Sequence, residues 1–162
     1  MSSMDMLSMI MQFGGFMIIA ILAIVIAVYV ITSLAIVRVL RICGYDKVWM
    51  AWIPYAQYWA LGEVACGVKP ALDIFGLVDI PKIVYQLWWV VTLAVSWLLP
   101  STPAFWINLI IQIVMLGTVY KNIYARVEGK DPSECNVIGY VSGWLTIISI
   151  VKFYCYDKNV RA

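Results

Sequence analysis

The sequence predicts an all-α integral membrane protein with three to four transmembrane helices and one aromatic helix that is interfacial or re-entrant. Of its 162 residues, 64% are hydrophobic and 12% are charged, whereas soluble domains carry about 25% charged residues. The apolar residues form long uncharged runs, and Lys and Arg stand between them. A chain with this much apolar surface is expected to have lipid as its solvent, as one helical membrane domain over residues 1–162.

The first predicted span is residues 15–37, an apolar run that ends at Arg38 and Arg41. At a helical rise of about 1.5 Å per residue it is long enough to cross a hydrocarbon core of about 30 Å. Because no Lys or Arg precedes it and it is far longer than the apolar part of a signal peptide, we expect an uncleaved anchor. Small residues at helical spacing would let another helix approach closely, although an aliphatic helix without special contacts explains them equally well. These residues are Ala20, Ala23 and Ala27.

Residues 48–62 form an uncharged aromatic run that we predict to be an interfacial or re-entrant helix. Fifteen helical residues rise only about 22 Å, and a proline in mid-run would cost a straight helix a backbone hydrogen bond. Amphipathic aromatic rings settle at the headgroup level of a bilayer. Residues 63–82 then read as a mixed-charge linker with solvated charges and a short apolar stretch at 71–78. The residues that define the aromatic run are Trp49, Trp52, Pro54, Tyr55, Tyr58 and Trp59.

Two further spans are predicted at residues 83–99 and 105–120, joined by a tight uncharged turn into a transmembrane hairpin. Counting outward from the turn, polar residues of the two helices fall at the same level. Lipid offers them no other hydrogen-bond partner, so each interhelical pair should stabilise the hairpin by roughly 0.6 to 2 kcal/mol. The alternative is a polar lining for a pore or a substrate path. The predicted pairs are Ser96 with Asn108 and Thr92 with Gln112.

Residues 136–151 are the last apolar block, preceded by a hydrophilic loop at 121–134 in which Gly129 should end any helix. The block contains Gly139 and Gly143, a small-xxx-small spacing that could seat a close helix contact. Packing within the chain is favoured over homodimerisation, since small residues serve both.

The distribution of Lys and Arg predicts the orientation. Five basic residues stand between the first and second spans, none in the hairpin turn, and three after the third span. The positive-inside rule therefore places the N-terminus outside and both charged loops in the cytoplasm. The last block is long and apolar enough to cross, which would put Lys152, Lys158 and Arg161 outside. An interfacial last block would instead keep all eleven basic residues inside.

Several classes of function are disfavoured by what the chain contains. A net charge of +2 with scattered basic residues implies no nucleic-acid partner. The chain has no His, and its four cysteines stand singly, so no metal, cofactor or catalytic residue is predicted. Glu63 directly follows the aromatic run, and its ordinary role is to end an interfacial helix in water. We expect Cys43, Cys66, Cys135 and Cys155 to be free thiols.

From Arg41 onward the chain resembles a functionally uncharacterised family of small bacterial multi-span membrane domains, sometimes fused to signal-peptidase-like proteins. The family motif is W-x-A-x-I-P-x-x-N/Q, followed by a G-K-P-like turn. Here Gln57 stands where the family has Asn, and one extra residue splits the turn. The resemblance implies a helical protein of the bacterial cytoplasmic membrane and no activity. The residues that carry it are Cys43-Gly44, Trp49, Ala51, Ile53-Pro54, Gln57, Trp59 and Gly67-Val68-Lys69-Pro70.

The function expected from these patterns is that of a non-enzymatic integral membrane subunit or self-assembling membrane protein, acting through helix–helix and lipid contacts. Its partners would be membrane lipid and either another protein or further copies of itself. The alternative is a small pore, channel or holin-like protein lined by the uncharged polar residues of the 83–120 hairpin. No predicted span contains an ionisable residue, which argues against proton-coupled transport.

Overall fold

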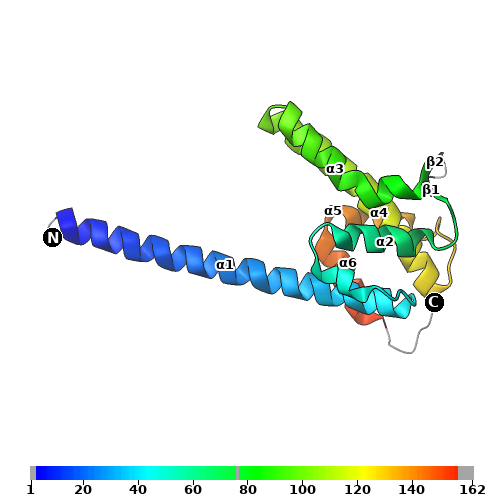
Figure 1. The fold of residues 1–162 in the computed structure, drawn as a ribbon, viewed down its shortest axis with the longest axis horizontal. Helices are drawn as coiled ribbons and strands as arrows, with labels where there is room; N and C mark the ends of the chain where they lie inside the picture. The colour runs from blue at the N-terminus through cyan, green and yellow to red at the C-terminus, as the bar shows by residue number, and fades with distance from the viewer. Residues whose placement is uncertain (1–2, 76, 157–162) are drawn as a thin grey trace. The chain divides into compact units, whose positions relative to one another are not determined.

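The computed structural model describes residues 3–75 and 77–156, with side chains from residue 14 onward, and it is mostly helical. The chain divides into two compact units, residues 1–33 and 34–162. The first unit is the N-terminal part of one long helix. All the remaining elements belong to the second unit (Figure 1). The elements are α1 (Ser3–Ile42), the 3-10 helix η1 (Val48–Trp52), α2 (Ala56–Cys66), β1 (Ala71–Ile74), β2 (Val78–Pro81), α3 (Lys82–Leu98), α4 (Ser101–Glu128), α5 (Asn136–Trp144) and α6 (Thr146–Cys155).

Helix α1 contains the first predicted span in full. It is 40 residues long, and eleven of its large apolar side chains from Phe16 to Ile31 are 47–72% exposed, whereas Val30 is half-buried. The last residues of α1 belong to the second unit, where Ala35, Val39 and Leu40 are completely buried in the core.

The aromatic run 48–62 is not the single helix predicted from the sequence. A 3-10 helix ends at Trp52, and α2 begins only at Ala56. Between them Tyr55 has a φ of 69°, which is a strained conformation for a non-glycine residue. Its ring lies 4.7 Å from that of Trp89 on α3, a contact that offsets the strain. The interruption by Pro54 therefore reorients the rings instead of keeping them on one helical face.

The predicted linker 63–82 contains a short β-hairpin within the mostly helical fold. Strands β1 and β2 pair antiparallel, with Leu72 opposite Ile80 and Asp73 opposite Asp79. Leu72 is buried, and its carbonyl accepts a hydrogen bond of 3.2 Å from the hydroxyl of Tyr85 on α3. The hairpin within the apolar stretch 71–78 is thus attached to α3.

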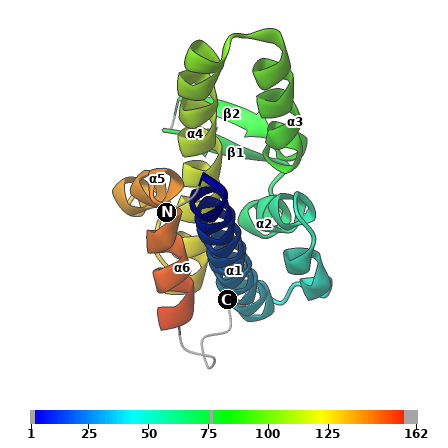
Figure 2. The ribbon, with the colours of Figure 1, turned by 90° about the vertical axis from the view of Figure 1, so that its left-hand side faces the viewer.

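Helices α3 and α4 form the antiparallel hairpin expected for residues 83–120, and the two run side by side in both views (Figures 1 and 2). At the end near the turn the large apolar side chains are exposed, with Trp97 at 89% and Phe105 at 61%. Further along α4 the residues from Leu116 to Ala125 are all buried, and they form the centre of the second unit. The helix continues eight residues past Tyr120 and ends at Gly129, whose φ of 64° is left-handed.

The predicted fourth span, residues 136–151, is two short helices rather than one. Helix α5 has nine residues and α6 has ten, and the chain turns between them at Leu145. At about 1.5 Å per residue each is about 14 to 15 Å long, half of a hydrocarbon core of about 30 Å. The turn allows Phe153 of α6 to become buried against Tyr120 and Tyr124 of α4.

The end of α6 returns to the charged end of α4. Lys152 forms an ion pair with Glu128, and the hydroxyl of Tyr156 donates a hydrogen bond of 2.9 Å to the same carboxylate. Arg38 donates a hydrogen bond to the backbone carbonyl of Tyr156. Lys152 and Lys130 therefore both lie at the Glu128 end of α4, whereas Lys158 and Arg161 lie outside the described residues.

Two helices in the described chain are long and apolar enough to cross a membrane. They are Gly14–Ile42 of α1 and Ser101–Glu128 of α4. Helix α3, with 17 residues, is shorter. The structure thus provides two candidate spans by length and composition, where the sequence predicts three to four.

Candidate functional site

One of the two polar pairs predicted for the hairpin forms a hydrogen bond. The side-chain amide of Asn108 on α4 donates to the hydroxyl of Ser96 on α3 at 2.8 Å. The Ser96 hydroxyl in turn donates to the carbonyl of Thr92 at 2.8 Å. Asn108 is therefore tied to α3 through a two-step chain of hydrogen bonds.

The second predicted pair does not meet in this way. Thr92 donates to the backbone carbonyl of Trp89 on its own helix at 2.8 Å, and within residues 3–75 and 77–156 no hydrogen bond joins it to Gln112. Gln112 instead lines a surface cavity of about 430 Å³ beside the Asn108–Ser96 bond. The side-chain oxygen of Asn108 is buried there without a hydrogen-bond partner. The cavity is lined by Ser96, Ser101, Ala104, Phe105, Asn108, Leu109 and Gln112.

The predicted aromatic residues occupy two environments. Trp49, Trp52 and Tyr55 are 42–58% exposed, and Pro54 beside them is exposed as well. Tyr58 and Trp59 are half-buried, and the Tyr58 ring packs edge-on against Trp88 of α3 at 5.1 Å. The first group can face an interface, and the second belongs to the α2–α3 contact.

The small residues predicted to mediate helix contacts also separate into two groups. Gly139 and Gly143 on α5 lie against Gly117 on α4, so closely that a Cβ atom at either would come within 2.7 Å of α4 atoms. This is a helix contact within the chain. By contrast Ala23 and Ala27 are exposed and Ala20 is half-buried, and these alanines lie in the first unit.

Lys121 is a buried cation that joins the β-hairpin to α4. Its side chain is 1% exposed, and its Nζ lies 3.1 Å from a carboxylate oxygen of Asp73 on β1. Asp73 faces Asp79 across the strand pair, an arrangement that repels like charges unless a cation is near. Phe75, in the turn after β1, stacks on Tyr140 of α5 at 4.2 Å between ring centres. The hairpin is thereby held to α3, α4 and α5.

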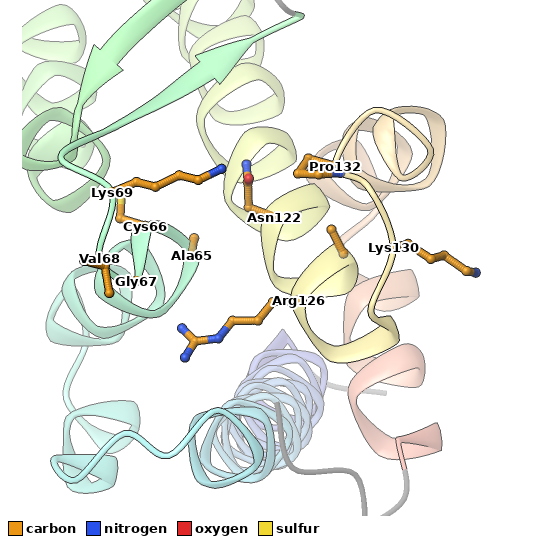
Figure 3. Close-up of a pocket in the computed structure, with 10 residues that line it drawn as sticks. Ala65, Cys66, Gly67, Val68, Lys69, Asn122, Arg126, Lys130 and Pro132 are labelled. Atoms are coloured by element: carbon orange, nitrogen blue, oxygen red, sulfur yellow. The ribbon is translucent and has the colours of Figure 1, made fainter.

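A second surface cavity, of about 360 Å³, lies between the end of α2 and the second half of α4 (Figure 3). Three of its lining residues are basic, namely Lys69, Arg126 and Lys130, and none is acidic. Lys69 extends along the opening toward Asn122, and Arg126 reaches from α4 toward α2 (Figure 3). Lys130 points away from the opening in the same view. The neutral lining residues are Ala65, Cys66, Gly67, Val68, Asn122, Ala125 and Pro132.

The three basic residues of this cavity differ in their partners. Lys130 pairs with Glu128 at 2.8 Å. Arg126 donates through Nη1 to the backbone carbonyl of Val64 at 3.0 Å, near the end of α2, but it forms no ion pair with any described residue. Lys69 has neither an ion pair nor a side-chain hydrogen bond within the described residues. Lys69 and Arg126 thus form no ion pair with a described carboxylate, and the carboxylate whose charge attracts Lys69 is that of Asp131.

Gly67 makes room for Arg126 at this cavity. Its φ of 53° is left-handed, and a Cβ atom at this position would lie 3.3 Å from Nη1 of Arg126. A side chain here would therefore both strain the backbone and push the guanidinium away from Val64.

The remaining titratable groups show ordinary structural roles. Lys82 pairs with Glu63 at 2.9 Å, and its hydrogen bond to Glu63 lowers the pKa of that carboxyl below its usual value. Burial raises the pKa of the Cys66 thiol, which keeps it protonated at neutral pH. All four cysteines are free, and Cys155 is the exposed one. Among the residues the structure describes, no three His, Cys, Asp or Glu side chains gather as a metal site.

The basic cavity is the feature that reasoning from the sequence missed. The sequence places these cations in two separate predicted loops, because Lys69 and Arg126 are 57 residues apart in the chain. The signal available in the sequence is the Gly67-Val68-Lys69-Pro70 turn. Its glycine and proline are typical of a helix end, and they place Lys69 directly after that end. No pattern in the sequence shows that α4 continues past Lys121 to bring Arg126 beside this turn.

Comparison of the chain with protein-family models, with curated proteins and with solved structures finds no match.

Proposed function

We propose that the protein is an integral membrane protein that acts through helix–helix and lipid contacts and not through catalysis. The observation that carries this proposal is the surface of α1 from Phe16 to Ile31. Large apolar side chains are 47–72% exposed on every face of this stretch, and Val30 alone among its aliphatic residues larger than Ala is half-buried. A helix that is apolar all round is either a buried core helix or a membrane span, and this one is not buried.

The hairpin of α3 and α4 supports the same proposal. No charged residue occurs between Lys82 and Lys121, and the apolar residues near the turn are the most exposed of the hairpin. The 20 residues from Ser101 to Tyr120 rise about 30 Å, which is the thickness of a hydrocarbon core. The ion pairs of the second unit all lie at the opposite end of this hairpin, around Glu63, Asp73 and Glu128. One end of the unit is thus suited to lipid and the other to water and headgroups.

The orientation follows from the basic residues. With the N-terminus outside, every Lys and Arg from Arg38 to Lys152 falls on the cytoplasmic side, once α5 and α6 are placed there with Glu128. The protein would then be a multi-pass protein of the bacterial cytoplasmic membrane. Trp49, Trp52 and Tyr55 would lie at the cytoplasmic headgroup level.

Alkaline carbonate extraction of membranes from expressing cells tests this proposal. The protein is expected to stay with the membrane pellet, because burial of α1 in lipid does not depend on ionic contacts. Release into the supernatant would contradict it. Blue-native electrophoresis in mild detergent then tests the contacts between helices of different chains. A species larger than the monomer, or a co-purifying protein, is expected, and a monomer alone would count against the assembly part of the proposal.

A second candidate function is a small pore, favoured by the cavity of about 430 Å³ beside Asn108. Four of its lining residues are polar and uncharged, and the side-chain oxygen of Asn108 has no partner there. In an assembled pore, water or an ion could be the partner of this oxygen. Dye or ion flux from liposomes containing the purified protein tests this function, and sealed liposomes would eliminate it.

A further inference from the structure

We propose that the cavity between α2 and α4 binds a phosphate group. The headgroup of an anionic phospholipid is one source of such a group, and a free phosphate or phosphate monoester is the other. The lipid source rests on the proposed membrane function, whereas binding of the phosphate group itself does not.

The charge of the cavity is the first step of the argument. Lys69, Arg126 and Lys130 line it without a single carboxylate, and Lys69 and Arg126 have no ion-pair partner among the described residues. Like charges gathered in a concave site repel each other, and the surrounding low-dielectric walls strengthen their combined potential. An anion in the cavity would remove this repulsion.

The nearby acids do not supply that anion. Glu128 accepts hydrogen bonds from Lys130, Lys152 and Tyr156. Asp131 accepts two from Ser133, through its backbone amide and its hydroxyl. Neither acid lines the cavity. Both carboxylates are engaged with other groups, and Asp131 attracts Lys69 without forming an ion pair with it, so the lining of the cavity keeps an excess of positive charge.

The donors present match a phosphate group. Arg126 uses Nη1 for the Val64 carbonyl, and the guanidinium has further N–H groups that can bind phosphate oxygens. Lys69 supplies an ammonium on a flexible stem that extends along the opening (Figure 3). Asn122, which is 7% exposed, donates to the carbonyl of Thr118, so its side-chain oxygen can accept a bond from a ligand hydroxyl. A volume of about 360 Å³ lies within the range of small-molecule sites.

The position of the cavity along α4 matches a lipid headgroup. The apolar run of α4 ends at Tyr120, so Asn122 and Arg126 lie about 3 and 9 Å beyond it at the helical rise. The headgroup layer on each side of a bilayer is about 5 to 7 Å thick. A phosphate at this depth would lie between Lys69 and Arg126 while its acyl chains remained in the hydrocarbon core.

Binding to the purified full-length protein in neutral detergent micelles tests the proposal. One arm titrates dioleoyl phosphatidic acid, a second arm titrates phosphatidylcholine, whose choline cancels the phosphate charge, and a third titrates inorganic phosphate without lipid. Native mass spectrometry reports bound lipid, and the thermal unfolding midpoint reports stabilisation by either ligand. We expect phosphatidic acid to bind and phosphatidylcholine to bind far more weakly.

The variants locate the binding. Lys69→Gln should weaken the apparent affinity roughly tenfold, as expected for the loss of one hydrogen bond to a charged group. Arg126→Lys keeps the positive charge but loses the planar guanidinium that can bind two phosphate oxygens at once, so it should weaken binding as well. The matched control is Lys47→Gln, which removes the same charge from an exposed position that does not line this cavity, and it should leave the affinity within about twofold.

Three outcomes overturn the proposal. They are an absence of binding in the phosphatidic acid and inorganic phosphate arms, an unchanged affinity in Lys69→Gln, and an equal loss in Lys47→Gln, which would indicate non-specific attraction. Binding of inorganic phosphate that depends on Lys69, without preference for phosphatidic acid, supports the cavity and identifies the free anion as its source. Carbonate extraction distinguishes failure of this proposal from failure of the proposed function. A protein that stays in the membrane pellet but binds neither ligand overturns the phosphate assignment alone.

Discussion

In the second unit, single pairs of polar side chains join neighbouring helices at two positions. Near the turn of the hairpin, Asn108 reaches Ser96 on the neighbouring helix at 2.8 Å. At the charged end, Glu63 meets Lys82 at 2.9 Å and joins α2 to the start of α3. In the proposed membrane placement, the first bond would lie where lipid offers no alternative partner and the second where water does, so the two should differ in strength.

Removal of the Asn108–Ser96 hydrogen bond should loosen the hairpin. We expect Asn108→Leu to lower the free energy of unfolding in detergent by about 0.6 to 2 kcal/mol. The double mutant with Ser96→Ala should lose less than the sum of the single changes, since both remove one bond. The control pair is Thr92→Val with Gln112→Leu, whose effects should add because no hydrogen bond joins these residues. Additive losses for Asn108 and Ser96 would show that their bond contributes nothing to stability.

The Glu63–Lys82 pair should make stability depend on pH in the acidic range. Because Lys82 holds the pKa of Glu63 below its usual 4.5, the unfolded state takes up a proton more readily than the folded state. The contribution is therefore present above the unfolded pKa and is lost as the pH falls through the folded one. Glu63 is 38% exposed, so water reduces the effect to less than about 1 kcal/mol. Unfolding midpoints between pH 7 and 3 should converge for the wild type and Glu63→Gln at low pH, and parallel curves would contradict this.

Among the elements, the closest helix contact is that of α4 with α5, and it depends on three glycines. Tyr140 of α5 lies against Gly117 of α4, where an added Cβ would come within 2.4 Å of the tyrosine ring. On the opposite side of the contact, Gly139 and Gly143 lie against backbone atoms of α4. Backbone atoms cannot move aside as the end of a flexible side chain can, so this contact should tolerate no larger residue.

A side chain at Gly143 should separate α4 from α5. An added Cβ would lie 2.7 Å from both the Gly117 nitrogen and the Ile113 carbonyl oxygen. We expect Gly143→Ala to lower the free energy of unfolding by about 1 to 3 kcal/mol, as overpacking usually does. Gly15→Ala is the control, since no atom lies within 4 Å of its added Cβ, and it should be neutral or slightly stabilising. A stable Gly143→Ala protein with an altered oligomeric state would instead favour a dimer contact at this glycine.

The elements also show which parts of the fold can be predicted from sequence. Uncharged length predicted α1 and the hairpin, and counting from the turn predicted that Ser96 lies level with Asn108, because both depend on local helical geometry. The break at Leu145 follows Gly143 by two residues, but that glycine also fits a continuous helix with a close packing contact, and the turn becomes evident only from the burial of Phe153 against α4. The β-hairpin and the basic cavity likewise depend on contacts between distant residues, such as Asp73 with Lys121 and Lys69 beside Arg126. Such contacts leave no periodic signal in a single sequence.

For the molecule as a whole, the return of α6 to Glu128 determines on which side the chain ends. In the proposed orientation the N-terminus lies outside and the end of α6 lies in the cytoplasm. The two candidate spans and the shorter α3 would then account for every crossing, giving three in total. The exposed Cys155 provides a natural reporter for this arrangement.

Labelling with a membrane-impermeant maleimide should reveal this topology. In a background with Cys43, Cys66 and Cys135 replaced by Ala, Cys155 should react in inverted membrane vesicles and remain unlabelled in intact cells. A Ser2→Cys variant, also carrying Cys155→Ser, should show the opposite pattern. Labelling of Cys155 from outside intact cells would contradict the cytoplasmic placement of α5 and α6 and restore a crossing by residues 136–151.

The buried ammonium of Lys121 limits how this protein can change over evolution. Its partner Asp73 lies in a segment that reads as an ordinary connecting loop, the kind of region where insertions and deletions usually accumulate. Shortening residues 71–81 would leave a cation in the core without its carboxylate, a loss that buried pairs tolerate poorly. Homologous chains should therefore keep the length of this connection and vary elsewhere, or else change residues 73 and 121 together.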